Sequence, residues 1–375
     1  MKIIVSHALY VDVIYVTKEG DLKTLGINNY EKQLDHWLTP HPKKDPQTKE
    51  MFTFGSRREK PYCIYRKISE DGVMGPKVDI TVDRPTYMHD LCITEHYVIF
   101  QELPYVYDPE VMQTSDHEWI FHFADGIWPR YGFLKRNATS EDKIRWFEFT
   151  NQSFFVFHNA NAWEVDKDTI VLYCCIMESN TKKDGSKYIF PADFQRYDIA
   201  LNFEISWPQL YKMTFDMKNN TAIKENISSN INGDFPKINE KYMGRKSKYI
   251  YISEVNRDNK IKSVVKYYLD RMKENRPYYK RFEFGTDIFA GEVVFVPKND
   301  DKWATNEDDG YLIVFAHHEV IDKDDPKKID SGISYVYVID AKRMISVAKL
   351  QLPTRVPYGF HAIYVTEKEL LDQKP

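Results

Sequence analysis

Residues 85–100 read Pro85-Thr-Tyr-Met-His-Asp-Leu-Cys-Ile-Thr-Glu-His-Tyr-Val-Ile-Phe100. The stretch opens on a proline, passes through a short polar turn that carries His89 and Asp90, and ends in an aromatic and β-branched run. Residues of that kind favour a β-strand. His89 therefore lies next to a predicted strand, where a rigid sheet can present a side chain to a site. Taken alone, a histidine in such a place is more often a hydrogen-bonded structural residue than a metal ligand.

Short strand-like runs of the same kind recur along the chain, separated by turn signals such as Asp71-Gly72 and Asp309-Gly310. The clearest runs are residues 13–16, 60–65, 169–175, 248–252, 311–315 and 333–339. Long amphipathic helical patterns are scarce, and the polar segment 256–275 is ambiguous between helix and strand. Many short strands joined by turns predict an all-β fold, either a sandwich, a barrel or a propeller. Periodicity alone does not choose among the three.

The composition narrows the class of protein further. A chain of 375 residues with a net charge of −4 gives no reason to expect a nucleic-acid partner. No run approaches the roughly 20 apolar residues of a membrane span, so we expect a cytoplasmic protein. The four cysteines show no C-x-x-C spacing, which favours free thiols in a reducing compartment. Cys174 and Cys175 are neighbours on a predicted strand and should face opposite sides of its sheet.

Three other phrases place a histidine in a similar setting. They are Thr39-Pro-His-Pro-Lys-Lys-Asp-Pro46, Phe157-His-Asn-Ala-Asn-Ala-Trp-Glu164 and Arg355-Val-Pro-Tyr-Gly-Phe-His-Ala-Ile-Tyr364. With residues 88–100 as the second of four phrases along the chain, they resemble, in the same order, the signature phrases of the carotenoid cleavage oxygenase family. On this resemblance the chain is identified as a member of that family. The resemblance implies that His41, His89, His158 and His361 are ligands of an iron(II) ion.

The same resemblance implies the architecture. Members of the family are seven-bladed β-propellers with iron on the axis and a cap of loops and short helices above it. The match covers nearly the whole chain and predicts a single propeller domain over residues 1–375. Only forty residues precede His41, fewer than in other members of the family. We therefore expect part of the usual N-terminal region to be absent, and two alternatives stay open: the chain is a fragment of a longer protein, or the propeller has an incomplete blade.

Two carboxylates match residues that support the ligand histidines in the family. The phrase Gly233-Asp-Phe-Pro-Lys-Ile-Asn239 resembles a family phrase with glutamate at the position of Asp234, and Glu292 matches a second supporting glutamate. Such carboxylates accept the second N–H of a ligand imidazole, fix its tautomer and offset the metal charge. Because aspartate is one methylene shorter, Asp234 is predicted to make a stretched or water-bridged hydrogen bond. A third glutamate aligns loosely with Val11, whose side chain accepts no hydrogen bond.

The reaction implied by the resemblance is oxidative cleavage of a C=C double bond by O2 at a non-haem Fe(2+) ion, which yields two carbonyl products. Four neutral imidazoles leave two positions of an octahedral ion free. The implied substrate is a lipophilic conjugated alkene, namely a carotenoid, an apocarotenoid or a stilbene. Two alternatives stay open: a catalytically degenerate propeller that binds an apolar ligand or a protein, and isomerisation at the same iron site. Peripheral membrane contact and the oligomeric state are not decided by the sequence.

Overall fold

The computed structural model describes residues 3–7, 10–57, 59–107, 121–124, 126–178, 207–228, 230–256, 260–271, 278–298, 306–320, 332–359 and 361–373. This part of the chain is almost entirely β-structure, which confirms the predicted all-β class. The described helices are the 3-10 turns η2 (Glu240–Tyr242) and η3 (Leu269–Arg271) and the short helix α3 (Glu367–Leu371). None of the helices in these ranges is long and apolar enough to cross a membrane.

The strands of the first half of the chain form five sheets, all antiparallel. The first contains β1 (Ile3–His7), β2 (Tyr10–Val16) and β3 (Leu22–Ile27), and the second contains β4 (Lys43–Lys44), β5 (Met51–Ser56), β6 (Cys63–Ile68) and β7 (Val78–Ile80). The third contains β8 (Cys92–Ile93), β9 (Tyr97–Glu102), β12 (Arg130–Lys135) and β13 (Arg145–Glu148), beside the pair β10 (Tyr105–Tyr107) and β11 (Phe121–Phe123). The next contains β14 (Phe154–Glu164), β15 (Thr169–Glu178), β16 (Gln209–Asp216) and β17 (Thr221–Asn226).

The second half of the chain forms one nine-stranded antiparallel sheet. Its strands are β18 (Gly233–Lys237), β19 (Tyr249–Val255), β20 (Ile261–Tyr268), β21 (Tyr279–Glu283), β22 (Ile288–Ala290), β23 (Val294–Pro297), β24 (Gly310–His318), β25 (Ile333–Asp340) and β26 (Ile345–Gln351). Each of the six strand-like runs predicted from the sequence overlaps a strand, although the run 60–65 does so only from Cys63 and the run 248–252 only from Tyr249. The ambiguous segment 256–275 contains β20, because pairing with β19 and β21 and burial of its apolar residues decide its conformation.

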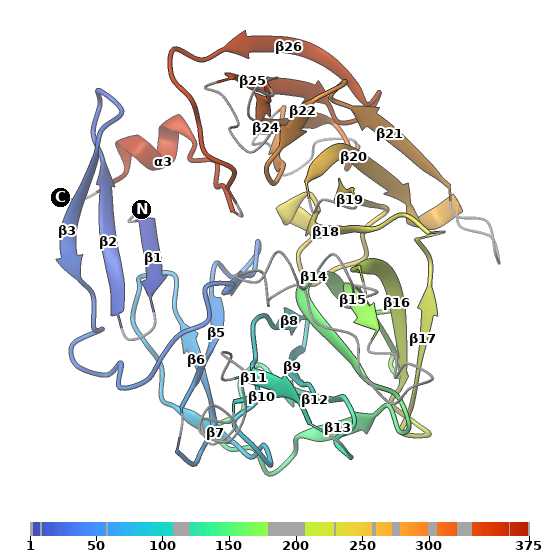
Figure 1. The fold of residues 1–375 in the computed structure, drawn as a ribbon. Coiled ribbons are helices and arrows are strands. Elements are labelled where there is room, and N and C mark those ends of the chain that lie inside the picture. The colour runs from blue at the N-terminus through green and yellow to red at the C-terminus, as the bar shows by residue number, and fades with distance from the viewer. Residues whose placement is uncertain are drawn as a thin grey trace, which may run out of the picture.

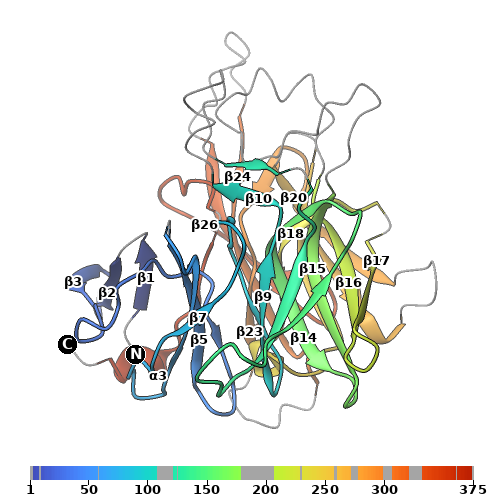
Figure 2. The same ribbon diagram turned by 90° about the horizontal axis from the view of Figure 1, so that it is seen from below.

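The sheets follow one another around a central region (Figure 1). In each of three of them the first strand, β8, β14 or β18, lies near the centre, and later strands such as β13, β17 and β21 lie at the outside. The β1–β3 sheet and α3 lie to one side of the strands β5–β7 (Figures 1 and 2). There the side chain of Gln373 accepts a hydrogen bond from the backbone N–H of Val16 and donates one to its carbonyl, at 3.0 and 3.1 Å.

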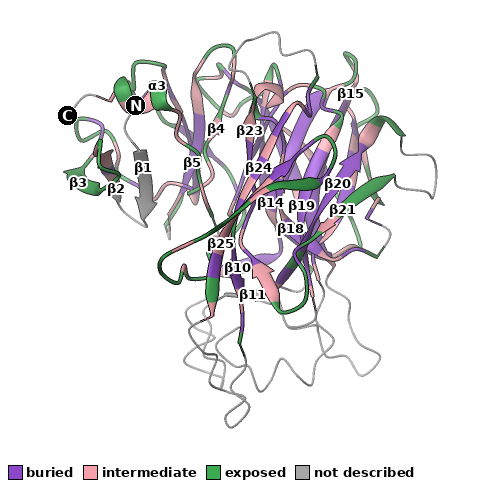
Figure 3. Ribbon diagram, turned by 90° about the horizontal axis from the view of Figure 1, so that it is seen from above, coloured by how far each residue is buried: buried purple, intermediate pink, exposed green. Residues whose placement is uncertain are grey.

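Three of the hydrophobic cores join residues of neighbouring sheets, and a further core lies among the strands of the nine-stranded sheet. One core joins residues of β5–β7 to β8 and β9, a second joins β9 and β12 to β14–β16, and a third joins β14–β16 to β19 and β20. Cys174 belongs to the second core and Cys175 to the third, so the two neighbours face opposite sides of β15 as predicted. All four cysteines are free. The central strands are therefore buried on both faces, whereas β3 and β26 are exposed (Figure 3).

The carboxylate of Asp45 links segments that belong to three of these sheets through ion pairs and hydrogen bonds. Its carboxylate is fully buried and accepts hydrogen bonds from Arg136, which follows β12, and from Arg245, which follows η2. The backbone N–H groups of Gln47 and Thr48 also donate to it. Burial by itself would raise the pKa of Asp45, but the hydrogen bonds from Arg136 and from the two backbone groups lower it to about 2.

We expect Asp45→Asn to lower the free energy of unfolding at pH 7 by about 3 kcal/mol, because it leaves two partly buried guanidinium groups without their counter-charge. The wild-type contribution should be complete above the unfolded-state pKa of about 4 and should be lost as the pH falls towards about 2. Urea unfolding of both proteins between pH 7 and pH 3 measures this. Equal stability of the two proteins at pH 7 would contradict the assignment.

Candidate metal centre

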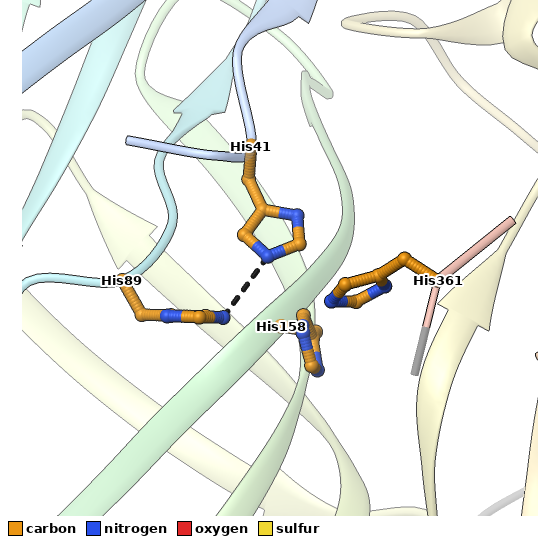
Figure 4. Close-up of side chains that lie close together, drawn as sticks. All are labelled: His41, His89, His158 and His361. Atoms are coloured by element: carbon orange, nitrogen blue, oxygen red, sulfur yellow. Dashed lines mark hydrogen bonds between the residues drawn. The ribbon is translucent and has the colours of Figure 1, made fainter. Parts of the chain in front are cut away.

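The structure brings the four predicted histidines together in one cluster (Figure 4). Each of His41, His89, His158 and His361 offers one ring nitrogen, and these four atoms all lie within 4.8 Å of one another. Nε2 of His41 and Nε2 of His89 are 2.9 Å apart. Residues separated by up to 320 positions in the sequence thus meet at one point.

Each of the four histidines lies on a different segment of the chain. His158 lies on β14, at a place where the pairing of β14 with β15 shifts register twice, and such bulges re-aim side chains. His89 lies in the turn before β8, and His41 forms an isolated parallel bridge with Asp90 just before β4. His361 lies in the segment between β26 and α3 and is the most exposed of the four, with a side chain that is 40% accessible.

The environment of the cluster favours neutral imidazoles at two of the four positions. Burial, together with neighbouring His89 and Lys43, holds the pKa of His41 far below its usual range. Burial and the other histidines lower the pKa of His89 to about 3. Burial also acts to lower the pKa of His158, but the carboxylate of Asp234 outweighs it and raises the pKa above 6.5. His41 and His89 therefore keep a free lone pair at neutral pH, which a metal ligand requires.

Two carboxylates contact the cluster, at the positions that the sequence predicted. Asp234 lies directly beside His158, with 3.0 Å between its Oδ1 and Nδ1 of the imidazole. The predicted stretched or water-bridged contact is thus wrong, because β18 comes close enough for the shorter side chain to reach. Oε1 of Glu292 lies 3.4 Å from Nδ1 of His361, so this contact is longer than the one between Asp234 and His158. The side chain of Val11 lies outside the described residues.

Glu292 is shared among three groups. Besides His361, it accepts a hydrogen bond from the backbone N–H of Ala362 at 3.0 Å and pairs with Nζ of Lys237 at 2.9 Å. The pKa of Glu292 is lowered, because the hydrogen bond from His361 and the charge of Lys237 outweigh its burial. Lys237 stands on β18, three residues after Asp234, so this one strand reaches both supporting carboxylates.

Phe235 has a backbone conformation that is unusual for its residue type. Its φ of 55° lies in the left-handed region, and the pairing of β18 with β19 shifts register between Asp234 and Lys237. The Phe235 ring lies 5.2 Å from the imidazole of His158 and 5.7 Å from that of His361. Backbone strain of this kind persists only where the surrounding structure enforces it. Here it lets consecutive residues present a carboxylate and an aromatic ring to the same cluster.

Aromatic side chains enclose the histidines on the side of β14. The ring of Tyr87 stacks on the imidazole of His89 at 5.9 Å and 13°, and Phe157 meets the same imidazole edge-on at 5.1 Å. Phe155 contacts both Tyr87 and Phe157. The sequence analysis did not assign these aromatic residues to the site, although Tyr87 and Phe157 stand within two positions of a predicted ligand. Only the packing of β14 against the turn before β8 reveals the contact.

The residues present fit a metal ion. Nε2 of His158 is buried and has no hydrogen-bond partner, an arrangement that is costly unless another group binds there. The donor set is four imidazole nitrogens, which suit iron, cobalt, zinc and copper better than magnesium or calcium. Carboxylates behind two of the imidazoles are the usual outer partners of metal-bound histidines. Chelation by all four requires only small movements, since the donor atoms already lie close together.

Comparison with known proteins identifies the family. The family model described as retinal pigment epithelial membrane protein (RPE65) matches residues 11–366. The chain belongs to this family, that of the carotenoid cleavage oxygenases. It is 40% identical over 371 residues to a carotenoid 9,10(9',10')-cleavage dioxygenase 1 of Arabidopsis thaliana, a match that covers 96% of this chain and 64% of that protein. It is 33% identical over 379 residues to a zeaxanthin 7,8(7',8')-cleavage dioxygenase of Crocus sativus, covering 98% of this chain and 94% of the relative.

Two solved structures of dioxygenase-type proteins share the fold of this chain. A lignostilbene dioxygenase of Pseudomonas brassicacearum superposes with a TM-score of 0.75 at 19% identity, over 96% of this chain and 73% of the other. A mutant of Synechocystis apocarotenoid oxygenase superposes with a TM-score of 0.74 at 20% identity, over 96% of this chain and 71% of the other. The chain spans a little under two thirds of the length of several plant relatives, for example 63% of the Phaseolus vulgaris protein.

Among the described residues, His36, His96, His317 and His318 are not part of this cluster. His317 and His318 are neighbours on β24, and His317 is buried with its Nδ1 3.0 Å from Oγ of Ser334. His96 pairs with Glu164 at the surface. His317 lines a pocket of about 220 Å³ beside the cluster, whose other walls include Phe289, Phe315 and Tyr358 and which reaches Glu292 and His361.

We expect Asp234→Asn to lower the pKa of His158 in the metal-free protein, because the imidazole then loses the carboxylate that acts most strongly against its burial. An NMR titration of the histidine side chains measures the change. Asp308→Asn, which removes an equally buried carboxylate that pairs with Lys266, serves as the control and should leave the titration of His158 unchanged. An unaltered pKa in Asp234→Asn would show that another group sets the protonation of His158.

Proposed function

We propose that this protein is a non-haem Fe(2+)-dependent dioxygenase that cleaves a C=C double bond of a carotenoid, an apocarotenoid or a stilbene with O2. The observation that carries the proposal is the convergence of His41, His89, His158 and His361, with their donor atoms within 4.8 Å of one another. Family membership supports it, since the relatives described above are named as dioxygenases that cleave carotenoids or lignostilbene.

The proposal extends to the architecture. The sheets that follow one another around the histidines are the blades of a β-propeller of the seven-bladed family type, forming one domain over residues 1–375, with loops and short helices capping an axial iron. Supporting this, three of the cores lie between facing sheets, and strands near the centre carry or flank the histidines. The cytoplasmic location predicted from the sequence and contact with a membrane surface both stay predictions.

Ferrous iron, when bound, supplies the activation of O2 for addition across an electron-rich double bond. The chain contributes the four imidazoles that hold the ion, and Asp234 and Glu292 accept the second N–H of His158 and His361. These hydrogen bonds fix which ring nitrogen faces the ion. With four neutral ligands, the two carboxylates also offset the charge that the ion brings into a buried site. No step requires a general base from the protein.

The surroundings of the histidines suit an apolar conjugated substrate. Tyr87, Phe157 and Phe235 present ring faces and edges beside the cluster, where a planar polyene or stilbene can pack against them. An apolar wall of this kind also keeps water away from the reacting carbons. The role of these aromatic side chains is thus to orient one double bond over the metal, which is the main contribution a protein makes to such chemistry.

We expect about one iron per chain after anaerobic purification with ferrous iron, since the four donor atoms already converge. His158→Ala should lose the metal, because it removes the most buried donor. The measurement is iron content by mass spectrometry, with thermal unfolding as a control for folding. A folded wild-type protein without iron would contradict the dioxygenase and leave the binding-module alternative.

The iron-loaded protein should convert a carotenoid, an apocarotenoid or a stilbene to two carbonyl products with consumption of O2, and His158→Ala should form none. Products are identified by mass spectrometry with ¹⁸O2, which labels the new carbonyl groups. A change in double-bond geometry without cleavage would instead indicate isomerisation. Iron binding without turnover of any of these substrates would count against the proposed reaction but not against the metal site.

A further inference from the structure

Three of the four histidine-bearing segments are held together by one carboxylate, that of Asp90. Asp90 directly follows His89 and is only 1% exposed. Its oxygens lie 2.8 and 3.0 Å from Nζ of Lys43, which stands two residues after His41. Its Oδ2 also accepts a hydrogen bond of 2.9 Å from the backbone N–H of Asn159, which directly follows His158. The contacts of Asp90 thus reach the segment of every histidine except His361.

A hydroxyl group reinforces the same connection. Oγ1 of Thr39 donates to the backbone carbonyl of His89 at 2.6 Å and accepts from the backbone N–H of His41 at 3.1 Å. His41 and Asp90 are also bridge partners in a parallel pair. The backbone segments that carry His41 and His89 are therefore linked twice, by the hydroxyl of Thr39 before His41 and by the Asp90–Lys43 ion pair after it.

This arrangement explains how His41 and His89 are held without carboxylates of their own. In the described part of the chain, Asp234 and Glu292 support His158 and His361, but no carboxylate is hydrogen-bonded to the ring of His41 or His89. Metal-binding histidines need an orienting partner, because a displacement of 1 Å is enough to impair a site. Asp90 and Thr39 supply the constraint through the backbone instead of through the imidazole rings.

From these contacts we infer that Asp90 is a positioning residue of the metal centre, which sets the relative placement of His41, His89 and His158 and thereby the affinity for the ion. The inference rests on the proposed function only in requiring that the cluster binds a metal. Removing the charge of Asp90 would leave the Lys43 ammonium without its counter-ion in a largely buried place, with a side chain only 12% exposed. Lys43 would then move towards solvent and take the segment of His41 with it.

Asp90→Asn tests the inference, because asparagine keeps the size of the side chain and one acceptor oxygen but loses the charge that holds Lys43. The probe is Co²⁺, which prefers the same nitrogen donors and has a visible absorption band sensitive to ligand geometry. We expect Co²⁺ to bind the variant about tenfold or more weakly than the wild type, the range found for partners of ligating histidines. The absorption band should also shift, which a general loss of stability would not cause.

Asp308→Asn is the matched control, since Asp308 forms another buried ion pair with a lysine, 2.6 Å from Nζ of Lys266. We expect it to lower the unfolding temperature while leaving the affinity and the spectrum of bound Co²⁺ unchanged. Lys43→Met removes the same ion pair from its other end. It should reproduce the weaker binding, and it replaces Asp90→Asn as the test if that variant does not fold.

The outcomes separate this inference from the proposed function. Wild-type affinity and an unaltered spectrum in both Asp90→Asn and Lys43→Met would overturn the role of Asp90 and leave the metal site standing. Failure of the wild-type protein to bind Co²⁺ or Fe²⁺ would overturn both. Weaker binding in the two variants, with Asp308→Asn unaffected, would establish Asp90 as the residue that couples the three segments.

Discussion

Packing between the faces of neighbouring sheets is the constraint on which the rest of this structure depends. Three of the cores lie between two sheets, so strands such as β9, β14 and β15 are covered on both faces and cannot shift without opening two cores. The same packing brings β14 within hydrogen-bonding reach of β18 on one side and of Asp90, which precedes β8, on the other. Side chains and turns at the centre are held by elements that are themselves rigid, which is the condition for a site with narrow geometric tolerance.

Charge at the centre is organised by buried carboxylates that each serve several groups. Asp45 joins two guanidinium groups to a turn, Asp90 joins a lysine to two backbone segments, and Glu292 is shared by Lys237, Ala362 and His361. Burying a carboxylate is unfavourable unless such partners compensate it. Multiple partners make the arrangement specific, because a carboxylate that is satisfied by three segments fixes their relative positions. The histidines lie on or next to these segments, so their relative positions are fixed as well.

The centre combines this polar framework with an apolar wall. His41 and His89 are kept neutral by burial and by nearby positive groups, while aromatic rings cover the imidazoles of His89, His158 and His361. Neutral donors in apolar surroundings suit a metal ion whose partners are O2 and a hydrocarbon chain, since both need a site from which water is excluded. The strained backbone of Phe235 belongs to this wall and stands beside the carboxylate of Asp234, so one irregular strand supplies both parts.

The sequence by itself determined the all-β class and indicated several of the strands, because apolar runs and turn residues are local features. The four histidines were singled out by the resemblance of the phrases around them to those of the family. It also indicated Asp234 and Glu292 through their phrases. Only the tertiary structure decided that Asp234 contacts His158 directly, that segment 256–275 contains a strand, and that Tyr87, Phe157 and Phe235 border the site. The connection of Lys43, Asp90 and Asn159 likewise has no local signature. These depend on distances between sheets, which arise when the cores pack and which no single stretch of sequence encodes.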